Sequence, residues 1–405
     1  QVMFGSDMAM RDTDVEMRGS SLAGQRIVLG ITGGIAAVDT VRLARELRRH
    51  GAELTVIMTQ SAQQIITPLA VRWASQCEVI TDWDGDLSAL DEVDGILVAP
   101  ATRNLMAGYV HGLNNGPLLM ALSAARGRGT ATMFVPSMHS DLAGDPITDD
   151  IVMEVRKHGV DVLWGEEVEG KKKTPPHDEI VAKFAHFINR IKPKRKSIVI
   201  TLGATRSAID DVRFVQNTSS GATGLILADH FYRLGHDVSC VAGVISCPIP
   251  SWLPLIVSTP NADDMLAELK AIARDNIDAW IHCAAVLDYR VANPAQGKVA
   301  SQQGTLQVEL IEGAKHIQIL KELCSGSVRI GFKLESGIKQ NDLIYRAVAQ
   351  IEKSGMTAVI ANRLEDLGNP DKPRGYLVDS HGAHFILEDE RKMCDAIQTF
   401  VERGV

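Results

Sequence analysis

The sequence predicts an α/β protein built from two doubly wound, Rossmann-like parallel-sheet domains. Its 405 residues exceed the size of one typical domain. Two segments, opening at Arg26 and at Ser197, each run through a short apolar strand, a polar turn, a helix and a second strand. Further apolar runs of strand length follow, and strands that alternate with helices form parallel sheets covered on both faces.

The first segment begins with the apolar strand Arg26–Gly30 and the turn TGGIAA. A helix is predicted next, because its apolar residues share one face at spacings of four, three and three: Ala37, Val41, Ala44 and Leu47. Gly51 ends that helix, and Leu54–Met58 is the second strand.

The second segment repeats this order, with strands Ser197–Leu202 and Val238–Ala242 around a helix from Thr223 to Leu234. The remaining buried strands are expected at Gly95–Ala99, Thr132–Val135, Ala279–Cys283, Val328–Phe332 and Ala358–Ala361. The basic, proline-containing stretch between the two segments indicates a linker. The expected ranges are a mobile tail at 1–21, a first domain at 22–190, the linker at 191–197 and a second domain at 198–405.

The composition excludes several classes of protein. A net charge of −8 and a pI near 5.9 give no electrostatic reason to expect nucleic acid as a partner. No stretch approaches about 18 apolar residues, so no contact with a membrane is expected. The 6 cysteines form no CxxC pairs, which indicates reduced thiols in a cytoplasmic protein and no metal site.

Gly33-Gly34 lies between a strand and a helix, where backbone amides can approach a phosphate; a tight turn without a ligand is the alternative. The surrounding run GITGGIAAVDTVRLARELRRHGAELTVIMTQSAQQIITP, with APAT at 99–102 and PSMH at 136–139, resembles the flavoprotein cysteine decarboxylases. That family includes the decarboxylase half of bifunctional coenzyme A biosynthesis proteins. The resemblance implies FMN, trimeric packing with the flavin at a subunit contact, and oxidation of a cysteinyl thiol before decarboxylation. It implies these FMN-binding residues: Thr32, Gly33, Gly34, Ser61, Ala101, Thr102 and Asn104.

The first half departs from that family at its catalytic positions. Asp86 stands where the family has its active-site histidine, and the loop GEEVEGKKKTPPHDE contains no cysteine. An aspartate replaces imidazole chemistry near neutral pH only if its pKa is strongly raised. His139 in PSMH is the second catalytic candidate, with a substrate-binding or structural role as its alternative. The half is therefore an active decarboxylase, a flavin-binding module or a structural core.

The second half contains the polar loop GATRSAIDDVRFVQNTSSGATG at 203–224, placed where parallel sheets bind ligands. A capped loop that binds nothing is the alternative. With CAAVLDYR at 283–290, GKVAS at 297–301 and GFKLES at 331–336, this half closely resembles phosphopantothenate–cysteine ligases. The resemblance implies activation of a carboxylate by a nucleoside triphosphate, attack by the amine of cysteine, and Mg²⁺ carried on the phosphates.

The ligase resemblance assigns roles by matching position. Asn217 contacts the acyl-nucleotide intermediate, Arg213 neutralises a carboxylate or phosphate, and Lys298 stabilises the phosphates. The expected CTP-binding residues are Ser219, Ser220, Gly221, Ala284, Ala285, Asp288, Phe332 and Lys353. The family's KIKK is KVAS here and its SSGKMG is SSGATG, so the preference for CTP over another nucleotide stays open.

Together the two resemblances imply coenzyme A biosynthesis by a bifunctional enzyme. Its substrates would be 4′-phosphopantothenate, cysteine and CTP. Its assembly would be a homo-oligomer with trimeric first domains and dimeric second domains, which combined give a dodecamer. Two alternatives remain. The chain is a diverged paralogue that acts on another cysteinyl or thiol carboxylate, or its first half is a non-catalytic oligomerisation or regulatory module.

Overall fold

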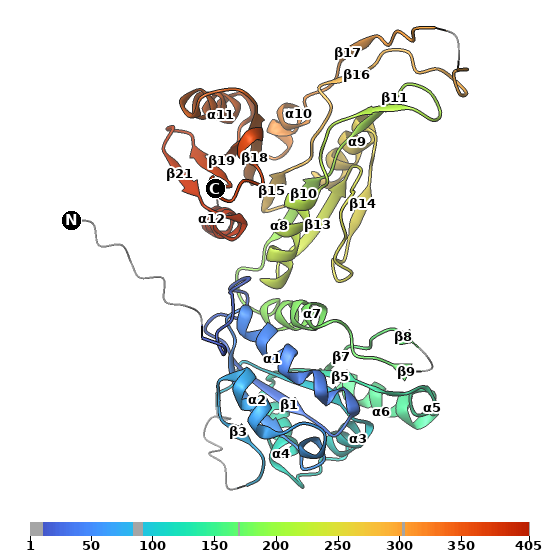
Figure 1. Ribbon diagram of the computed structural model, residues 1–405, viewed down its shortest axis with the longest axis vertical. Coiled ribbons are helices and arrows are strands. Elements are labelled where there is room, and N and C mark those ends of the chain that lie inside the picture. The colour runs from blue at the N-terminus through green and yellow to red at the C-terminus, as the bar shows by residue number, and fades with distance from the viewer. Residues whose placement is uncertain (1–10, 84–91, 169–170, 302–303, 405) are drawn as a thin grey trace, which may run out of the picture. The chain divides into compact units, whose positions relative to one another are not determined.

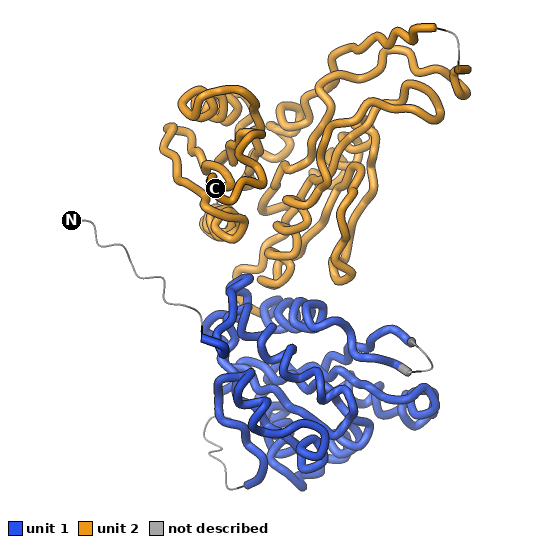
Figure 2. Tube along the Cα trace, viewed as in Figure 1, with its two compact units in different colours: residues 1–191 blue, residues 192–405 orange. Residues whose placement is uncertain are grey.

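Figure 1 shows the computed structural model, which describes residues 11–83, 92–168, 171–301 and 304–404. The chain divides into two compact units, residues 1–191 and 192–405 (Figure 2). The border falls at the beginning of the stretch expected as a linker. In the described part of the chain, no helix is both long and apolar enough to cross a membrane.

Unit 1 is organised around a parallel sheet with the strand order β3-β2-β1-β4-β5-β7. Its strands are β1 Arg26–Ile31, β2 Glu53–Met58, β3 Val79–Ile80, β4 Gly95–Ala101, β5 Ala131–Pro136 and β7 Asp161–Val162. Every pair in this sheet is parallel. The order reverses between β1 and β4, which is the point where such sheets bind ligands beyond the carboxyl ends of their strands.

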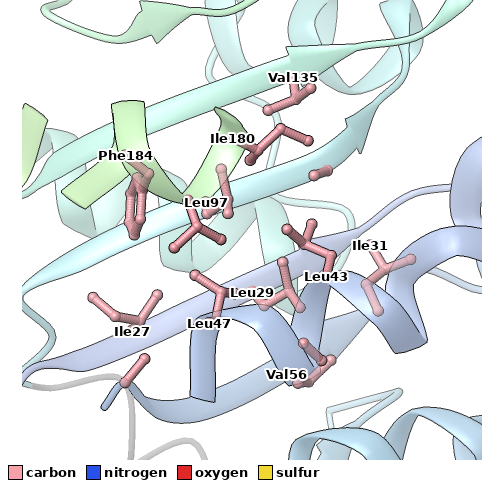
Figure 3. Close-up of a cluster of buried hydrophobic side chains, with 14 of the residues drawn as sticks. Ile27, Leu29, Ile31, Leu43, Leu47, Val56, Leu97, Val135, Ile180 and Phe184 are labelled. Atoms are coloured by element: carbon pink, nitrogen blue, oxygen red, sulfur yellow. The ribbon is translucent and has the colours of Figure 1, made fainter. Parts of the chain in front are cut away.

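Helices cover both faces of the unit 1 sheet, as the doubly wound prediction requires. The helical segments are η1 Ile35–Asp39, α1 Thr40–Arg49, η2 Ala62–Gln64, α2 Pro68–Ser75, α3 Arg103–Val110, α4 Pro117–Arg128, α5 Ser140–Ala143, α6 Pro146–Lys157 and α7 His177–Asn189. On one face Leu43 and Leu47 of α1 and Phe184 of α7 pack on Leu29 and Leu97 (Figure 3). A separate apolar cluster on the other face joins α3, α4 and α6 to the same strands. A small antiparallel sheet of β6 Met138–His139, β9 Lys171–Lys172 and β8 Glu167–Val168 completes the unit.

Residues 11–21, expected as part of a mobile tail, pack against α1. Arg45 donates to the carbonyl of Asp14 at 2.8 Å, and Arg48 donates to the carbonyl of Thr13 at 2.8 Å. Arg18 forms an ion pair with Glu46 at 3.2 Å. The polar composition of this stretch suggested a tail, but its carbonyl groups satisfy arginines that the exposed face of α1 presents. The remainder of the expected tail, residues 1–10, lies outside the described residues.

Unit 2 contains a larger sheet with the order β14-β13-β10-β15-β18-β19-β20-β21. Its strands are β10 Ser197–Leu202, β13 Asp237–Ala242, β14 Ile256–Ser258, β15 Ala279–His282, β18 Val328–Glu335, β19 Ala358–Arg363, β20 Gly375–Asp379 and β21 His384–Leu387. Strands β14 to β19 are parallel, whereas β20 pairs antiparallel with both β19 and β21. The purely parallel prediction is therefore corrected at this edge. The short turn after Asp379, whose carboxylate accepts from the amide of Ala383 at 3.0 Å, permits only an antiparallel return.

The helices of unit 2 are α8 Ala222–Arg233, α9 Ala262–Ile272, α10 His316–Leu323, α11 Gln340–Ser354, η4 Leu364–Asp366 and α12 Glu390–Arg403. Two antiparallel ribbons extend beyond the main sheet (Figure 1). They pair β11 Arg206–Ala208 with β12 Phe214–Gln216 and β16 Tyr289–Val291 with β17 Leu310–Glu312. The sequence indicated only polar loops here, because these strands are short and mostly exposed.

Candidate active sites

Thr32 joins the carboxyl ends of two neighbouring strands in unit 1. It follows β1 directly, and its buried hydroxyl donates to the carbonyl of Pro100 in β4 at 2.8 Å. The same oxygen accepts from the backbone amide of Thr102 at 3.0 Å. Because β1 and β4 flank the point where strand order reverses, these bonds hold the two edges of the expected binding crevice in place.

Gly33 and Gly34 form the turn after Thr32, and Ser61 lies directly beside it. A Cβ on Gly33 would come within 2.4 Å of Ser61 Oγ, so glycine is needed for this close approach. Ser61 Oγ also lies 3.2 Å from Thr59 Oγ1. Gly34 begins η1 without a capping side chain. The turn therefore places backbone amides and two hydroxyls together, and such groups suit the phosphate of a cofactor.

The remaining expected FMN residues follow β4 at the same edge. Ala101 is its buried last residue, and Thr102 caps α3 by accepting from the amide of Leu105 at 3.4 Å. Asn104 is exposed in the first turn of α3. The structure thus brings the whole expected FMN set to one edge of the unit 1 sheet.

His139 comes three residues after the end of β5 and caps α5. Its Nδ1 accepts from the backbone amide of Asp141 at 3.3 Å and lies 3.2 Å from the carboxylate of the same residue. With 53% of its side chain exposed, the imidazole is accessible to a ligand. The other catalytic candidate of this half, Asp86, lies outside the described residues.

Sequence reasoning missed an ion pair between Arg103 of α3 and Asp145, whose closest atoms are 2.7 Å apart. A hydrogen bond from the backbone amide of Ile147, together with the Arg103 guanidinium, lowers the pKa of Asp145. The sequence did offer a partial signal, since Asp145 followed by Pro146 is typical of a helix start. It gave no indication that the cap would also hold Arg103.

In unit 2, Asn217 links the loop after β10 to the segment after β15. Its Nδ2 donates to the carbonyls of Ala285 and Val286, both at 3.2 Å. Thr205 strengthens the same junction, because its fully buried hydroxyl accepts from the amide of Leu287 at 2.8 Å. The Asn217 side chain is thereby held at the carboxyl ends of adjacent strands β10 and β15, and these bonds use only its amide nitrogen.

The first turn of α8 packs tightly on the end of β10. A Cβ on Gly224 would lie 2.3 Å from the Cβ of Leu202, and Gly221 has a left-handed φ of +86° as the helix N-cap. Ser220 Oγ accepts from the amide of Ala222 at 3.3 Å, while Ser219 is half-buried. The hydroxyls and amides of this turn consequently face the same edge of the sheet as Asn217.

Arg213 is held by Asp210, a residue that the sequence interpretation did not single out. Their closest atoms are 2.6 Å apart, and the Asp210 side chain is fully buried. Burial opposes ionisation of Asp210, but hydrogen bonds from the backbone amides of Val212, Arg213 and Val299 and the Arg213 charge lower its pKa to about 2. Part of the Arg213 charge is therefore already compensated before any substrate binds.

The same acidic pair positions Lys298. The amide of Gly297 donates to Asp211 at 3.1 Å, and that of Val299 donates to Asp210 at 3.1 Å. Both neighbours of Lys298 are thus anchored while its own side chain is exposed. The sequence interval between Arg213 and Lys298 concealed this contact.

A cleft of about 610 Å³ lies beside this cluster, between the β11–β12 ribbon and residues 294–296. The Arg206 guanidinium, which lines it, stacks 4.9 Å from the centre of the Phe214 ring. Arg213 lines the cleft as well. Within the described residues, no group of three or more His, Cys, Asp or Glu side chains could hold a metal ion.

The other expected CTP residues fall into three positions. Ala284 and Ala285 follow β15 at its carboxyl end, and Phe332 lies one residue beyond Gly331, the partner of His282 in the adjacent strand. Asp288 is exposed and forms an ion pair with the amino group of Lys315. All of these lie at or beyond the edge occupied by Asn217.

Lys353 is the exception among the expected nucleotide residues. It is exposed in the last turn of α11, which runs back from the carboxyl end of β18 to the amino end of β19. At 1.5 Å per residue, thirteen residues of helix carry it about 20 Å from the start of α11. The structure therefore does not bring Lys353 to the edge shared by the other residues, because position in sequence did not reveal the direction of the helix.

Comparison with known proteins agrees with this two-unit arrangement. The family described as Flavoprotein matches residues 16–189, and the DNA/pantothenate metabolism flavoprotein C-terminal domain matches residues 194–402. The coenzyme A biosynthesis bifunctional protein CoaBC of Thermococcus kodakarensis is 34% identical over 86% of this chain and 88% of its own length. The protein of the same name from Vibrio vulnificus is 32% identical over 84% of this chain and 87% of its own.

Among solved structures, the DNA/pantothenate metabolism flavoprotein from Streptococcus pneumoniae is 23% identical, with a TM-score of 0.46, and the match covers 50% of this chain and 97% of that one. The identity to the two bifunctional relatives extends across both units and nearly the full length of each relative. The chain belongs to the family of coenzyme A biosynthesis bifunctional proteins, CoaBC.

Proposed function

We propose that unit 2 joins 4′-phosphopantothenate to cysteine with CTP, and that unit 1 decarboxylates the product with FMN. Family membership supports both reactions. The observation that carries the proposal is the position of Asn217, held between the loop that begins α8 and the segment after β15. The product of unit 2 is then the substrate of unit 1, which explains why one chain contains both.

Ligation begins with a carboxylate, which is a poor electrophile. Its oxygen attacks the α-phosphorus of CTP, pyrophosphate leaves, and a mixed acyl–cytidylate anhydride forms. The amine of cysteine then attacks the acyl carbon, CMP leaves with the bonding electrons, and the ammonium loses a proton. Several anions meet in this pocket, so oriented amides and cations are needed, with Mg²⁺ carried on the phosphates.

The residues of unit 2 divide this work by position. Asn217 orients the acyl–nucleotide, and the Ser219–Gly221 turn binds a phosphate through hydroxyls and amides. Lys298, anchored through its neighbours by Asp210 and Asp211, supplies positive charge to the phosphates. The cleft bordered by Arg206 and Arg213 suits the anionic acid substrate.

The turn of unit 1 fits an FMN phosphate, because Gly33 lacks the Cβ that would block Ser61 and the hydroxyls of Ser61 and Thr59 lie together. When bound, the flavin takes two electrons from the cysteinyl thiol and later returns them. Thr102 and Asn104 would border the ring system, and His139 would hold the substrate carboxylate or a proton at Nδ1.

Exposed apolar residues beside this turn support a trimer of unit 1. Ile35 is 77% exposed and Val38 is 53% exposed, and both lie in η1 directly after Gly34. Large apolar side chains grouped at a ligand site are typical of a subunit contact. We further propose a dimer through unit 2 and a cytoplasmic location, which suits the six unpaired cysteines.

Assays on the purified full chain test both halves of the proposal. Pyrophosphate release should require 4′-phosphopantothenate, cysteine and CTP together, and Asn217→Asp or Lys298→Ala should reduce it at least about 100-fold. Carbon dioxide release from phosphopantothenoylcysteine and a flavin absorption band test unit 1. Failure of wild-type protein to release pyrophosphate with any common nucleoside triphosphate would rule out the ligase assignment.

A further inference from the structure

Arg374 lies at the beginning of β20, beside the first turn of α8. Its Nη2 donates to the Thr223 hydroxyl at 2.8 Å. Because β20 runs antiparallel to β19, Arg374 also lies at the carboxyl end of the parallel strands, where residues of the proposed ligase site gather. No sequence motif pointed to this arginine.

A buried asparagine orients the guanidinium from the other side. Asn362 is 6% exposed, and with its amide turned to satisfy both neighbours, its oxygen accepts from Arg374 Nη1 at 2.6 Å. Its nitrogen then donates to the carbonyl of Ala361 at 3.0 Å. Gly375 makes room for this contact, because a Cβ there would lie 2.5 Å from Asn362 Oδ1. Arg374 is therefore held on two sides by a built arrangement.

Both of these partners are neutral. Among the described residues, no carboxylate forms an ion pair with Arg374, whereas Arg213, Lys315, Lys333 and Arg363 each have one. The nearby Cys283 thiol does not supply a negative charge, because burial raises its pKa well above the ordinary value. A half-buried guanidinium without a counter-charge is costly, and an anionic ligand would relieve that cost.

Resting on the proposed ligase function, we propose that Arg374 binds a phosphoryl group of a ligase substrate at the first turn of α8. The guanidinium has five N–H donors, and the bonds to Thr223 and Asn362 occupy two. The remaining donors can pair with phosphate oxygens in the forked geometry that arginine favours. The phosphoryl group belongs either to the nucleotide or to the phosphorylated acid.

The test compares Arg374→Gln, Arg374→Lys and Arg403→Gln in the full chain. Arg403 is exposed in the last turn of α12, at the opposite end of that helix from its start near the site, and serves as the matched control. Calorimetry gives the Kd of Mg–CTP, and pyrophosphate release gives kcat and the KM of CTP and of 4′-phosphopantothenate. Thermal unfolding shows that each variant is folded.

We expect Arg374→Gln to weaken one of the two phosphorylated substrates by about 10- to 100-fold, the usual effect of losing charge-assisted hydrogen bonds. Arg374→Lys should recover part of the loss, because it retains charge without the fork. A change confined to CTP assigns the group to the nucleotide, and a change confined to 4′-phosphopantothenate assigns it to the acid.

If wild-type protein binds and uses both substrates, but Arg374→Gln and Arg374→Lys leave both KM values and the CTP Kd within twofold, the inference is wrong and the ligase assignment stands. A lowered Tm with unchanged KM values has the same meaning, since it shows a purely structural role. If wild-type protein itself neither binds nor uses CTP, the proposed function fails first.

Discussion

The buried carboxylate of Asp210 lies 2.6 Å from the guanidinium of Arg213. Its second contact, with the backbone amide of Val299 at 3.1 Å, joins residues that are far apart in sequence. One acidic side chain thereby positions an arginine and the segment that carries Lys298. Its effect on ligation is consequently larger than its distance from the chemistry suggests.

Replacing Asp210 with Asn should therefore impair ligation. The neutral amide cannot balance Arg213, and it loses acceptor capacity for the amides of Val212, Arg213 and Val299. We expect kcat/KM for ligation to fall by about 10- to 100-fold, measured by pyrophosphate release. Asp371→Asn, an exposed substitution in the same unit, is the control. Equal kcat/KM values for the two variants would contradict the positioning role.

Acid should destabilise unit 2 through His236. Burial lowers the pKa of His236 to about 4, and its Nδ1 accepts from the backbone amide of Lys196 at 3.1 Å. The folded-state pKa is below the unfolded value of 6.5, so the unfolded chain binds the extra proton. The contribution is complete above pH 6.5 and is lost as the pH falls toward 4, up to about 3 kcal/mol.

Chemical unfolding of wild-type protein and His236→Asn at several pH values measures this effect. Asparagine retains an acceptor for the Lys196 amide but does not titrate in this range. The pH dependence of unfolding should accordingly be shallower in the variant between pH 6.5 and 4. Parallel curves for the two proteins would show that another group is responsible.

Gly33→Ala should weaken FMN binding by unit 1. The new Cβ would lie 2.4 Å from Ser61 Oγ, which forces apart the two loops expected to hold the phosphate. We expect the FMN dissociation constant to rise at least about tenfold, as misplaced phosphate donors would cause, measured by flavin fluorescence titration. Gly127→Ala in α4 meets nothing within 4 Å and should bind FMN as wild type does. Unchanged affinity in Gly33→Ala would remove this turn from the site.

Gly224→Ala should destabilise the start of α8. Its Cβ would come within 2.3 Å of the Cβ of Leu202, so the helix must move away from β10. Overpacking of this kind costs about 1–3 kcal/mol, and ligation should fall as the Ser219–Gly221 turn shifts. Gly326→Ala, which has open space around it, is the control for denaturant unfolding and ligation. Wild-type behaviour of both variants would show that this packing is dispensable.

The parallel strands were predictable because buried strands are continuous apolar runs. The runs at 95–99 and 358–361, for example, lie within β4 and β19. The β20–β21 return and the two ribbons were not predictable, since their exposed faces interrupt the apolar pattern: Phe385 and Ile386 are 63% and 58% exposed. Motif position placed Asn217 and Thr32 at strand ends, but it misplaced Lys353, whose location depends on the direction of α11.

By itself, the sequence determined the α/β class, the parallel strand segments and the loops that carry the site residues. These properties follow from local apolar periodicity and from glycine and hydroxyl residues at strand ends. Only the tertiary structure decided that Asp210 would hold Arg213 and Val299, or that Asn362 would orient Arg374. Those contacts join segments whose separation along the chain carries no local signal, and packing of the sheet alone brings them together.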